Sequence, residues 1–507
     1  MKSMKRYLLL LLPLLLMTSC GESLFDTYKN FAGDGEIRYV GKVSDLTVSP
    51  GWQRILLDWK NSDDPIIDKM EVKWVVDDKR DSVFLPVGTT SYVIGNLTQG
   101  NNYEVTVCSV DKEGRESLPT TTYVRPYNQD HEAVLAFNRV VARSFFLHNH
   151  LLLTFNGWDS NIKDAYLTYR TKSNGEEKKV QLTEEVVDGL HLDLPDVDAS
   201  KPVSVYREGY IEGCEDLITF APINLETEPL FNSEFKQEMK RQFGYDVTIP
   251  ESFYSQCEQL DLDWKINDFA DLLYFPKLKK LYLGKNRHVR PEMVDDKEVG
   301  QSQVTDVELS DWVLAKLHEL NGLEVYRYDK HFSTLTKESY VKDMGHSPEP
   351  DVTLISMKGA KVTVMPEESQ ELIQLGWSSH PEYLVDGNEN TSWKPYVQNA
   401  STTYTIDVEL PADHTVKGMR LVQSYYGASE AAMRALCPAQ IRVYKSVDGG
   451  YFPVATNLED TNIGNSTGEV NYISFAKAER IKYVRIVVTT PMYFKNFQVS
   501  LAEIGLY

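Results

Sequence analysis

Leu384-Val385-Asp386-Gly387-Asn388-Glu389-Asn390-Thr391-Ser392-Trp393 is the stretch that decides the fold of the C-terminal part of this chain. Asp386-Gly387-Asn388 has the composition of a tight turn, in which Gly387 tolerates a positive φ. Downstream, Trp393 and Tyr404 bring large apolar area to a core, and residues 483–487 alternate in side-chain type as a strand does. We therefore expect short strands packed around a buried aromatic centre.

Four further segments follow this turn in order. They are Tyr404-Thr405-Ile406-Asp407-Val408, Val443-Tyr444-Lys445-Ser446-Val447-Asp448-Gly449-Gly450, Lys482-Tyr483-Val484-Arg485-Ile486-Val487-Val488 and Leu501-Ala502-Glu503-Ile504-Gly505-Leu506-Tyr507. Together with the turn, their order and spacing resemble the discoidin or coagulation-factor type C domain. The resemblance covers residues 351–507 and implies a jelly-roll sandwich of galactose-binding-like topology.

The same resemblance implies a structural calcium ion. In related carbohydrate-binding modules, the turn and the C-terminal Ala-Glu meet and hold the metal. Carried over residue by residue, this assigns Asp386, Thr391 and Glu503 as side-chain ligands and Ala502 as a backbone carbonyl ligand. Oxygen ligands from a tight loop suit a hard cation such as calcium. In the alternative interpretation, Asp386 and Glu503 merely cap turns.

Ligands of this fold bind at loops on one end of the sandwich. A sugar needs a flat aromatic face for its C–H patch and a few polar groups for its hydroxyls. The candidate binding residues in expected loops are Trp377, His380, Tyr425, Tyr426, Arg434, Tyr493, Phe494 and Phe497. Each of them taken singly is also compatible with a place in the core or at the rim.

The N-terminus reads as an export signal. Lys2, Lys5 and Arg6 precede an apolar run from Leu8 to Leu16, which is too short for a membrane-spanning helix of ~20 residues. Met17-Thr18-Ser19-Cys20 resembles the bacterial lipobox. We expect residues 1–19 to be a signal peptide, Cys20 to be lipidated and residues 20–40 to form a stalk. A plain secretory signal with an incidental cysteine is the alternative.

Two sandwiches are expected next, at residues 41–128 and 129–225. Ile55, Leu57 and Trp59 alternate with polar residues, and turn-rich segments separate such runs. The stretch Leu97-Thr98-Gln99-Gly100-Asn101-Asn102-Tyr103-Glu104-Val105 resembles the end of a fibronectin type III domain. Residues 55–59 align with residues 151–155, which indicates a duplicated unit. Paired domains of this kind resemble those of uncharacterised envelope lipoproteins of Bacteroides-type bacteria.

The sequence pattern of residues 226–350 differs from that of the two sandwiches before it. Residues 233–239 have the pattern of a short amphipathic helix. Leu260-Asp261-Leu262 and Leu281-Tyr282-Leu283 have the spacing of a leucine-rich repeat, with Asn286 capping a turn, and residues 314–325 form a degenerate further unit. An ordinary α/β segment with coincidental leucines is the alternative. The fold class expected for the whole chain is thus mainly β and multidomain.

The composition and the motifs argue against several classes of function. The net charge of −21 argues against nucleic-acid binding, which requires clustered Lys and Arg. Cys108, Cys214, Cys257 and Cys437 lie too far apart to indicate a zinc ribbon or a disulfide framework. No HExxH, GxSxG, P-loop or GxGxxG motif is present, so we expect a binding protein, with no enzymatic activity.

We expect a lipoprotein of the bacterial outer membrane, held by its lipid anchor alone and displayed on the cell surface. Its C-terminal domain would bind a glycan or glycoconjugate in polysaccharide acquisition, with an outer-membrane protein as a further partner. Two alternatives remain open. One is an adhesion or protein-interaction component with a structural jelly roll, and the other is an accessory enzyme with its activity in residues 226–350.

Overall fold

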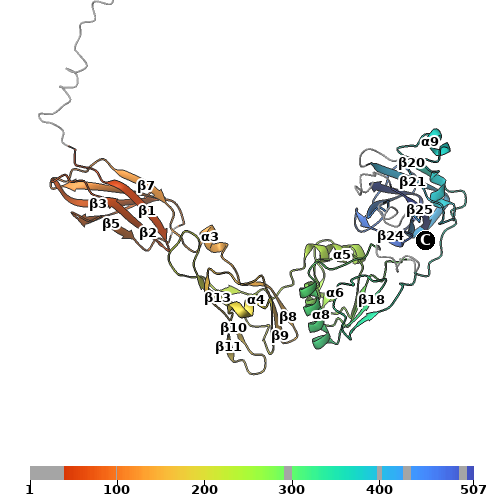
Figure 1. The fold of residues 1–507 in the computed structure, drawn as a ribbon, viewed down its shortest axis with the longest axis horizontal. Coiled ribbons are helices and arrows are strands. Elements are labelled where there is room, and N and C mark those ends of the chain that lie inside the picture. The colour runs from red at the N-terminus through yellow and green to blue at the C-terminus, as the bar shows by residue number, and fades with distance from the viewer. Residues whose placement is uncertain (1–38, 99, 290–299, 397–401, 426–435, 490–498) are drawn as a thin grey trace, which may run out of the picture.

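The computed structural model describes residues 39–98, 100–289, 300–396, 402–425, 436–489 and 499–507. Four bodies follow one another along an extended, bent chain (Figure 1). Within the described residues, no helix is long and apolar enough to cross a membrane. The proposed signal peptide, Cys20 and nearly all of the stalk lie outside the described residues.

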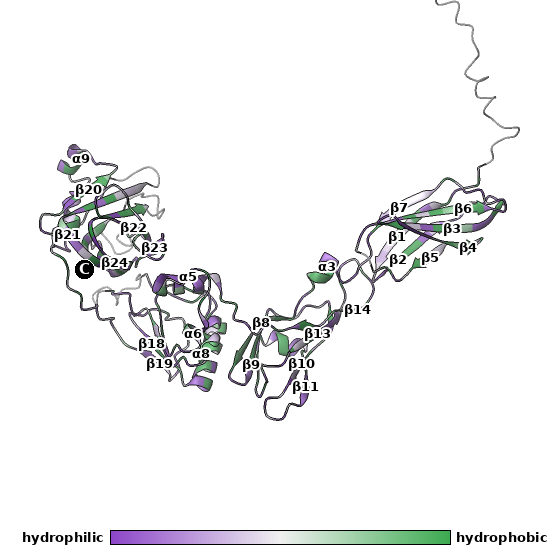
Figure 2. Ribbon diagram, turned by 180° about the vertical axis from the view of Figure 1, so that it is seen from behind, coloured by the Kyte–Doolittle hydropathy of each residue, from purple (hydrophilic) through white to green (hydrophobic). Residues whose placement is uncertain are grey.

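The first body is a sandwich of a three-stranded and a four-stranded sheet. The three-stranded sheet has the order β1-β2-β5, with β1 Ser44–Gly51, β2 Arg54–Lys60 and β5 Ser91–Ile94. The other has the order β4-β3-β6-β7, with β3 Ile67–Val76, β4 Lys79–Pro86, β6 Tyr103–Asp111 and β7 Thr120–Val124. Hydrophobic and hydrophilic residues alternate along these strands (Figure 2), and such strands bury one face each. Ile55, Leu57 and Trp59 are accordingly buried.

The second body repeats this plan. Its small sheet has the order β8-β9-β12, with β8 Val141–Leu147, β9 His150–Phe155 and β12 His191–Leu194. Its large sheet is β11-β10-β13, with β10 Ile162–Arg170, β11 Glu177–Gln181 and β13 Ser204–Gly209, and β14 Ile218–Thr219 and β15 Ile223–Asn224 pair with β13. The helices are α3 Glu132–Leu135 and α4 Glu184–Asp188. Because β9 occupies the place of β2 and β10 that of β3, the strand pairing supports the expected duplication.

The third body, residues 226–350, is called the α/β region below. Its sheet is parallel with the order β16-β17-β18-β19, formed by Gln259–Leu262, Lys280–Leu283, Glu324–Arg327 and Val341–Asp343. Leu260, Leu281 and Val325 stand in register, as the leucine-rich spacing predicts. The connecting segments are unequal: η1 Ala270–Tyr274 in one and α8 Val307–Asn321 in the next, with α5 Ser233–Phe243 and α6 Glu251–Tyr254 before the sheet. The repeat is therefore regular in its strands and irregular between them.

The turn residue Asn286 has a role somewhat different from the expected one. Its side-chain amide donates to Asp263 Oδ2 at 3.0 Å, and its backbone N–H donates to Asp263 Oδ1 at 3.0 Å. It thus ties the turn after β17 to the turn after β16 through a side chain. The α/β region also shares a core with the second sandwich, since Phe145, Leu147 and Leu152 belong to its hydrophobic cluster.

The fourth body, residues 351–507, is a jelly roll. Its strands are β20 Lys361–Met365, β21 Thr403–Gln423, β22 Gln440–Ser446, β23 Thr461–Asn462, β24 Val470–Thr489 and β25 Leu501–Leu506. The first half of β21 pairs with β20, and its second half pairs with β25. β24 pairs along both halves of β21, and β22 and β23 extend the sheet from its second half. The two long strands therefore each serve both layers of the sandwich.

The expected aromatic centre is present. Trp393 and Tyr404 are fully buried and meet edge to face, with ring centroids 5.5 Å apart. Two short helices, α9 Gln370–Gln374 and η2 Pro381–Val385, lie between β20 and β21.

A buried ion pair joins the jelly roll to the α/β region. Arg287 Nε and Nη2 donate to the two carboxylate oxygens of Glu469, each at 2.8 Å, and the two side chains are 3 % and 0 % exposed. Arg287 Nη1 also donates to Ser302 Oγ at 3.0 Å, and the Ser466 N–H donates to Glu469 at 3.0 Å. A β-carbon at Gly464 would overlap the Glu469 carboxylate, so the position requires glycine. The two bodies thus pack as one unit.

Candidate ligand-binding end and cation site

Three loops of the jelly roll are tied together at one end. Ser379 Oγ accepts from the Lys394 N–H at 2.5 Å and donates to the Ser392 carbonyl at 2.8 Å. Ser392 Oγ in turn lies 2.7 Å from Ser424 Oγ. These bonds join the loop after α9, the loop before β21 and the loop after β21. We call this set of loops the aromatic end, because each of the three carries an aromatic residue.

Trp377 is the most prominent side chain of the aromatic end. It is 54 % exposed and stacks on Tyr396, with ring centroids 5.8 Å apart and planes 26° apart. Tyr396 is itself 38 % exposed, and its N–H donates to Glu368 Oε1 at 3.2 Å. Sequence reasoning missed Tyr396, although its position three residues after Trp393 in a loop was a usable signal. The pair offers an exposed aromatic face beside polar groups.

The other predicted binding residues are distributed less favourably. His380 is exposed and packs edge to face against Tyr383, at 5.8 Å between ring centroids. Tyr425 is half-buried against Gly468, where a β-carbon would strike its ring. The remaining candidates lie outside the described residues: Tyr426, Arg434, Tyr493, Phe494 and Phe497.

The turn at Asp386 meets the C-terminal strand. Thr391 Oγ1 donates to Asp386 Oδ2 at 2.8 Å, and the Gly387 N–H donates to Glu503 Oε1 at 3.3 Å. Backbone bonds between Trp393 and Leu501, at 2.9 and 3.1 Å, hold the turn and β25 together. The structure therefore gathers the four residues assigned to a metal from two segments that are distant in sequence.

Glu503, which lies on β25 and bonds to this turn, is an unusually buried carboxyl group. It is 7 % exposed, and its Oε2 atom is buried with no hydrogen-bond partner among the described residues. The pKa of Glu503 is raised to about 7, mainly by burial and also by the neighbouring Asp386, while the Gly387 N–H and Arg420 act in the opposite direction. Ala502 is the extra residue of a bulge, since the register with β21 passes from Glu503 directly to Leu501.

This arrangement fits a hard cation. A buried carboxylate oxygen without a donor, next to a second carboxylate, is costly unless a positive charge lies between them. Within the described residues there is no group of three or more His, Cys, Asp or Glu side chains placed to hold a metal. A cation here would need the Thr391 hydroxyl and backbone carbonyls to complete an oxygen shell, which is the chemistry of calcium.

Comparisons with known proteins agree with this fold. Residues 367–503 match the F5/8 type C domain family, and residues 20–207 match a family described as a domain of unknown function. No curated protein matches the chain.

Three solved structures are similar to parts of the chain. One is a carbohydrate-binding module of Clostridium perfringens in complex with GalNAc-β-1,3-galactose, at 16 % identity and a TM-score of 0.25, covering 31 % of this chain and 99 % of that one. Another is the family 32 module of C. perfringens NanJ in complex with galactose, at 15 % identity and a TM-score of 0.24, covering 30 % and 97 %. A two-domain fibronectin type III segment of chicken tenascin has 16 % identity and a TM-score of 0.19, covering 36 % and 97 %.

One body of the chain carries the buried Trp393–Tyr404 pair and the two long strands shared between the layers. The family match covers the same body. The C-terminal body of this chain is an F5/8 type C domain of the discoidin type.

Proposed function

We propose that this chain binds carbohydrate, without catalysis, through the aromatic end of its F5/8 type C domain. The stacked, exposed pair of Trp377 and Tyr396 carries the proposal. An exposed ring face attracts the C–H patch of a sugar, and polar groups in the adjoining loops can bond its hydroxyls.

The test uses the full chain without its leader. We expect Trp377→Ala to abolish retention of at least one glycan on an array, while Tyr451→Ala leaves it unchanged. Tyr451 is a suitable control because it is also a highly exposed aromatic residue of the jelly roll. Equal retention by both variants would refute binding at the aromatic end. Release of sugar products from a retained glycan would refute the non-catalytic part.

A protein partner is the second candidate, and one observation favours it. Leu375, two residues before Trp377, is 54 % exposed, and Met365 at the end of β20 is also exposed. Exposed apolar side chains mark protein-binding surfaces when they form a continuous patch. Loss of adhesion to cells or to an outer-membrane protein in Leu375→Ser, with glycan retention intact, would favour this candidate.

We further propose that calcium occupies the turn, with Asp386, Thr391 and Glu503 as side-chain ligands and the Ala502 carbonyl completing them. The ion would neutralise the buried Glu503 carboxylate and hold the turn against β25. We expect a chelator to lower the melting temperature of the wild-type chain but not that of Asp386→Asn. An unchanged melting temperature in the wild-type chain would refute the proposal.

The leader supports a proposal about location. We propose that Cys20 is lipidated and anchors the protein in the outer membrane, with its domains on the cell surface, where it acts in polysaccharide acquisition. Two or more acyl chains give stable anchoring. Incorporation of a labelled fatty acid, lost in Cys20→Ser, and cleavage by protease added to intact cells would be expected. Labelling that persists in Cys20→Ser, or complete protection from protease, would refute the respective parts.

A further inference from the structure

Three cavities lie along the boundary between the α/β region and the jelly roll. Their volumes are about 690, 660 and 580 Å³, and Trp264 and Asn462 line all three. Because the two residues come from opposite sides of the boundary, the cavities are neighbouring parts of one groove. Ligand sites typically have 300–1,000 Å³, so the largest cavity alone has the size of a site. We call this largest cavity the inter-domain cleft.

The walls of the cleft are held in place by the contacts across the boundary. Besides the Arg287–Glu469 pair, the Val470 N–H donates to the His288 carbonyl at 3.1 Å, and the Gly300 N–H donates to Ser466 Oγ at 2.9 Å. Asn457 Nδ2 donates to the Arg241 carbonyl at 3.3 Å. A cleft between bodies joined in this way keeps its shape without a ligand, which lowers the entropic cost of binding.

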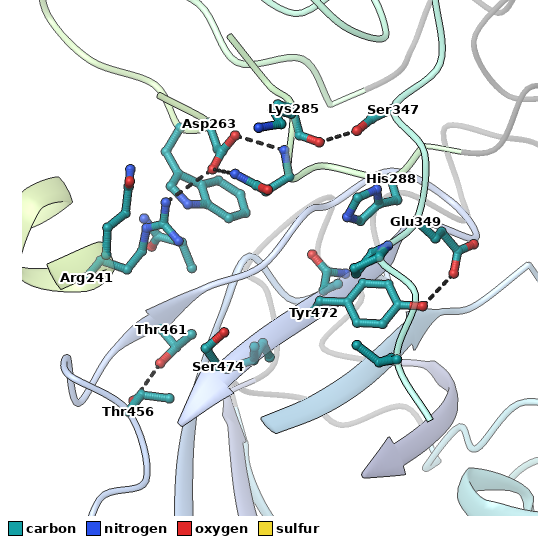
Figure 3. Close-up of a pocket in the computed structure, with 18 of the residues that line it drawn as sticks. Arg241, Asp263, Lys285, His288, Ser347, Glu349, Thr456, Thr461, Tyr472 and Ser474 are labelled. Carbon is teal, nitrogen blue, oxygen red and sulfur yellow. Dashed lines mark hydrogen bonds and ion pairs between the residues drawn. The ribbon is translucent and has the colours of Figure 1, made fainter. Parts of the chain in front are cut away.

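Neutral polar groups and aromatic rings dominate the lining. Figure 3 shows Asp263, Lys285 and His288 on the side of the α/β region and Tyr472 and Ser474 on the facing strand β24. The His288 and Tyr472 rings meet edge to face, at 5.4 Å between centroids. Side-chain amides and hydroxyls line both walls as well: Asn286, Asn457, Asn462, Thr456 and Thr461.

The charged groups of the cleft are already paired. Arg241 Nη2 lies 2.6 Å from Glu238 and 3.3 Å from Asp263, and Lys285 Nζ lies 3.3 Å from Asp261. Glu349 accepts from the Tyr472 hydroxyl at 2.7 Å.

Arg420 reaches the same Glu349 carboxylate at 3.4 Å. Burial lowers the pKa of His288, which favours its neutral form. These pairings leave little reason for an ionic ligand to bind and suit an uncharged one.

A peptide strand fits the cleft poorly. β23, the sheet edge that lines it, has only two residues, Thr461 and Asn462. Such a short edge offers too few backbone groups to pair with a further strand. A ligand with many hydroxyls and apolar C–H faces matches the amides, hydroxyls and rings better.

We propose that the inter-domain cleft is a second ligand site, which takes a neutral oligosaccharide of two or more sugar units. It goes beyond the proposed function, because no residue of the aromatic end lines it. The site is composite: neither the α/β region nor the jelly roll alone would form it.

The test blocks the cleft in the full chain lacking its leader. Ser474 is exposed on β24 and lines the cleft, so Ser474→Trp fills it without touching the core. Ser356→Trp makes the same change at an exposed position of the jelly roll outside the cleft and serves as the control. Both are compared with Trp377→Ala on an array of neutral and anionic glycans, after circular dichroism has shown unchanged folding.

We expect Ser474→Trp to lose neutral oligosaccharides that Trp377→Ala and Ser356→Trp still retain. If Ser474→Trp retains every glycan of the wild-type chain, the cleft proposal is overturned, whatever Trp377→Ala does. If the glycans lost are anionic only, or if a peptide array rather than the glycan array detects the block, the proposal also fails. If Trp377→Ala loses nothing while Ser474→Trp does, the cleft stands and the aromatic end fails.

Discussion

Arg287→Met is expected to be the most damaging single change at the boundary between the α/β region and the jelly roll. It removes both 2.8 Å bonds from Arg287 to the Glu469 carboxylate, which is 0 % exposed. Of the three hydrogen bonds to this carboxylate given above, only the one from the Ser466 N–H remains. Breaking a buried ion pair by removing one partner costs about 3–5 kcal/mol. For a unit of this size, that loss corresponds to a fall of roughly 10 °C in melting temperature.

The assay is calorimetry combined with hydrogen exchange on the full chain. The matched control is Arg442→Met, which breaks a pair of similar length, 2.6 Å to Asp460, between side chains that are about half exposed. Surface pairs contribute about 0–1 kcal/mol, so this control is expected to shift the transition little. Exchange of the Val470 N–H, which bonds across the boundary to His288, is expected to rise in Arg287→Met alone.

A compensating double variant tests the role of the ion pair from the opposite direction. Replacing a buried ion pair by apolar residues of similar volume is often neutral. Arg287→Met combined with Glu469→Leu should therefore recover much of the lost stability. A loss of stability in Arg287→Met no larger than that in Arg442→Met would refute the role given to the ion pair, and so would a double variant less stable than Arg287→Met alone.

Three further predictions follow from the buried groups of the chain. Without calcium, the pKa of Glu503 is raised to about 7 in the folded state, against 4.5 for the unfolded group. The contribution of this carboxyl to the free energy of unfolding is therefore fully present below pH 4.5, and about 3 kcal/mol is lost as the pH rises through 7. Calorimetry at pH 5 and 8 with chelator should show this fall, and its absence would contradict the buried state of the carboxyl. Glu503→Gln should flatten the same profile, and a variant that keeps the wild-type slope would assign it to another group. Trp393→Ala should cost about 3–5 kcal/mol by urea unfolding, because its ring is fully buried; a loss below 1 kcal/mol would place the core elsewhere.

Features with a local signature were predictable from the sequence. The alternation at Ile55, Leu57 and Trp59 has the period of a strand, and burial of these three side chains follows from that period. The in-register stacking of Leu260 on Leu281 follows from the matching Leu-X-Leu patterns of the two strands, because each strand presents the same face to a common core. Val325 joins the same register after a longer connection.

The candidate sites were predictable only in part. The resemblance to the discoidin type nominated Asp386 and Glu503 together, although residues 387 and 503 bond across 116 positions of sequence. The place of Tyr396 in a loop after Trp393 was a usable signal, but its stacking on Trp377 depends on how two loops converge, which no spacing encodes.

By itself, the amino-acid sequence determined the strands, the buried aromatic centre of the jelly roll and the order of the domains, since alternation and turn chemistry act between near neighbours. Only the tertiary structure decided that Arg287 meets Glu469 across 182 positions, and that Trp264 and Asn462 face one groove. Charges and amides carry no periodic signal, and their partners are chosen by the packing of whole domains. The cleft therefore exists only in the folded chain.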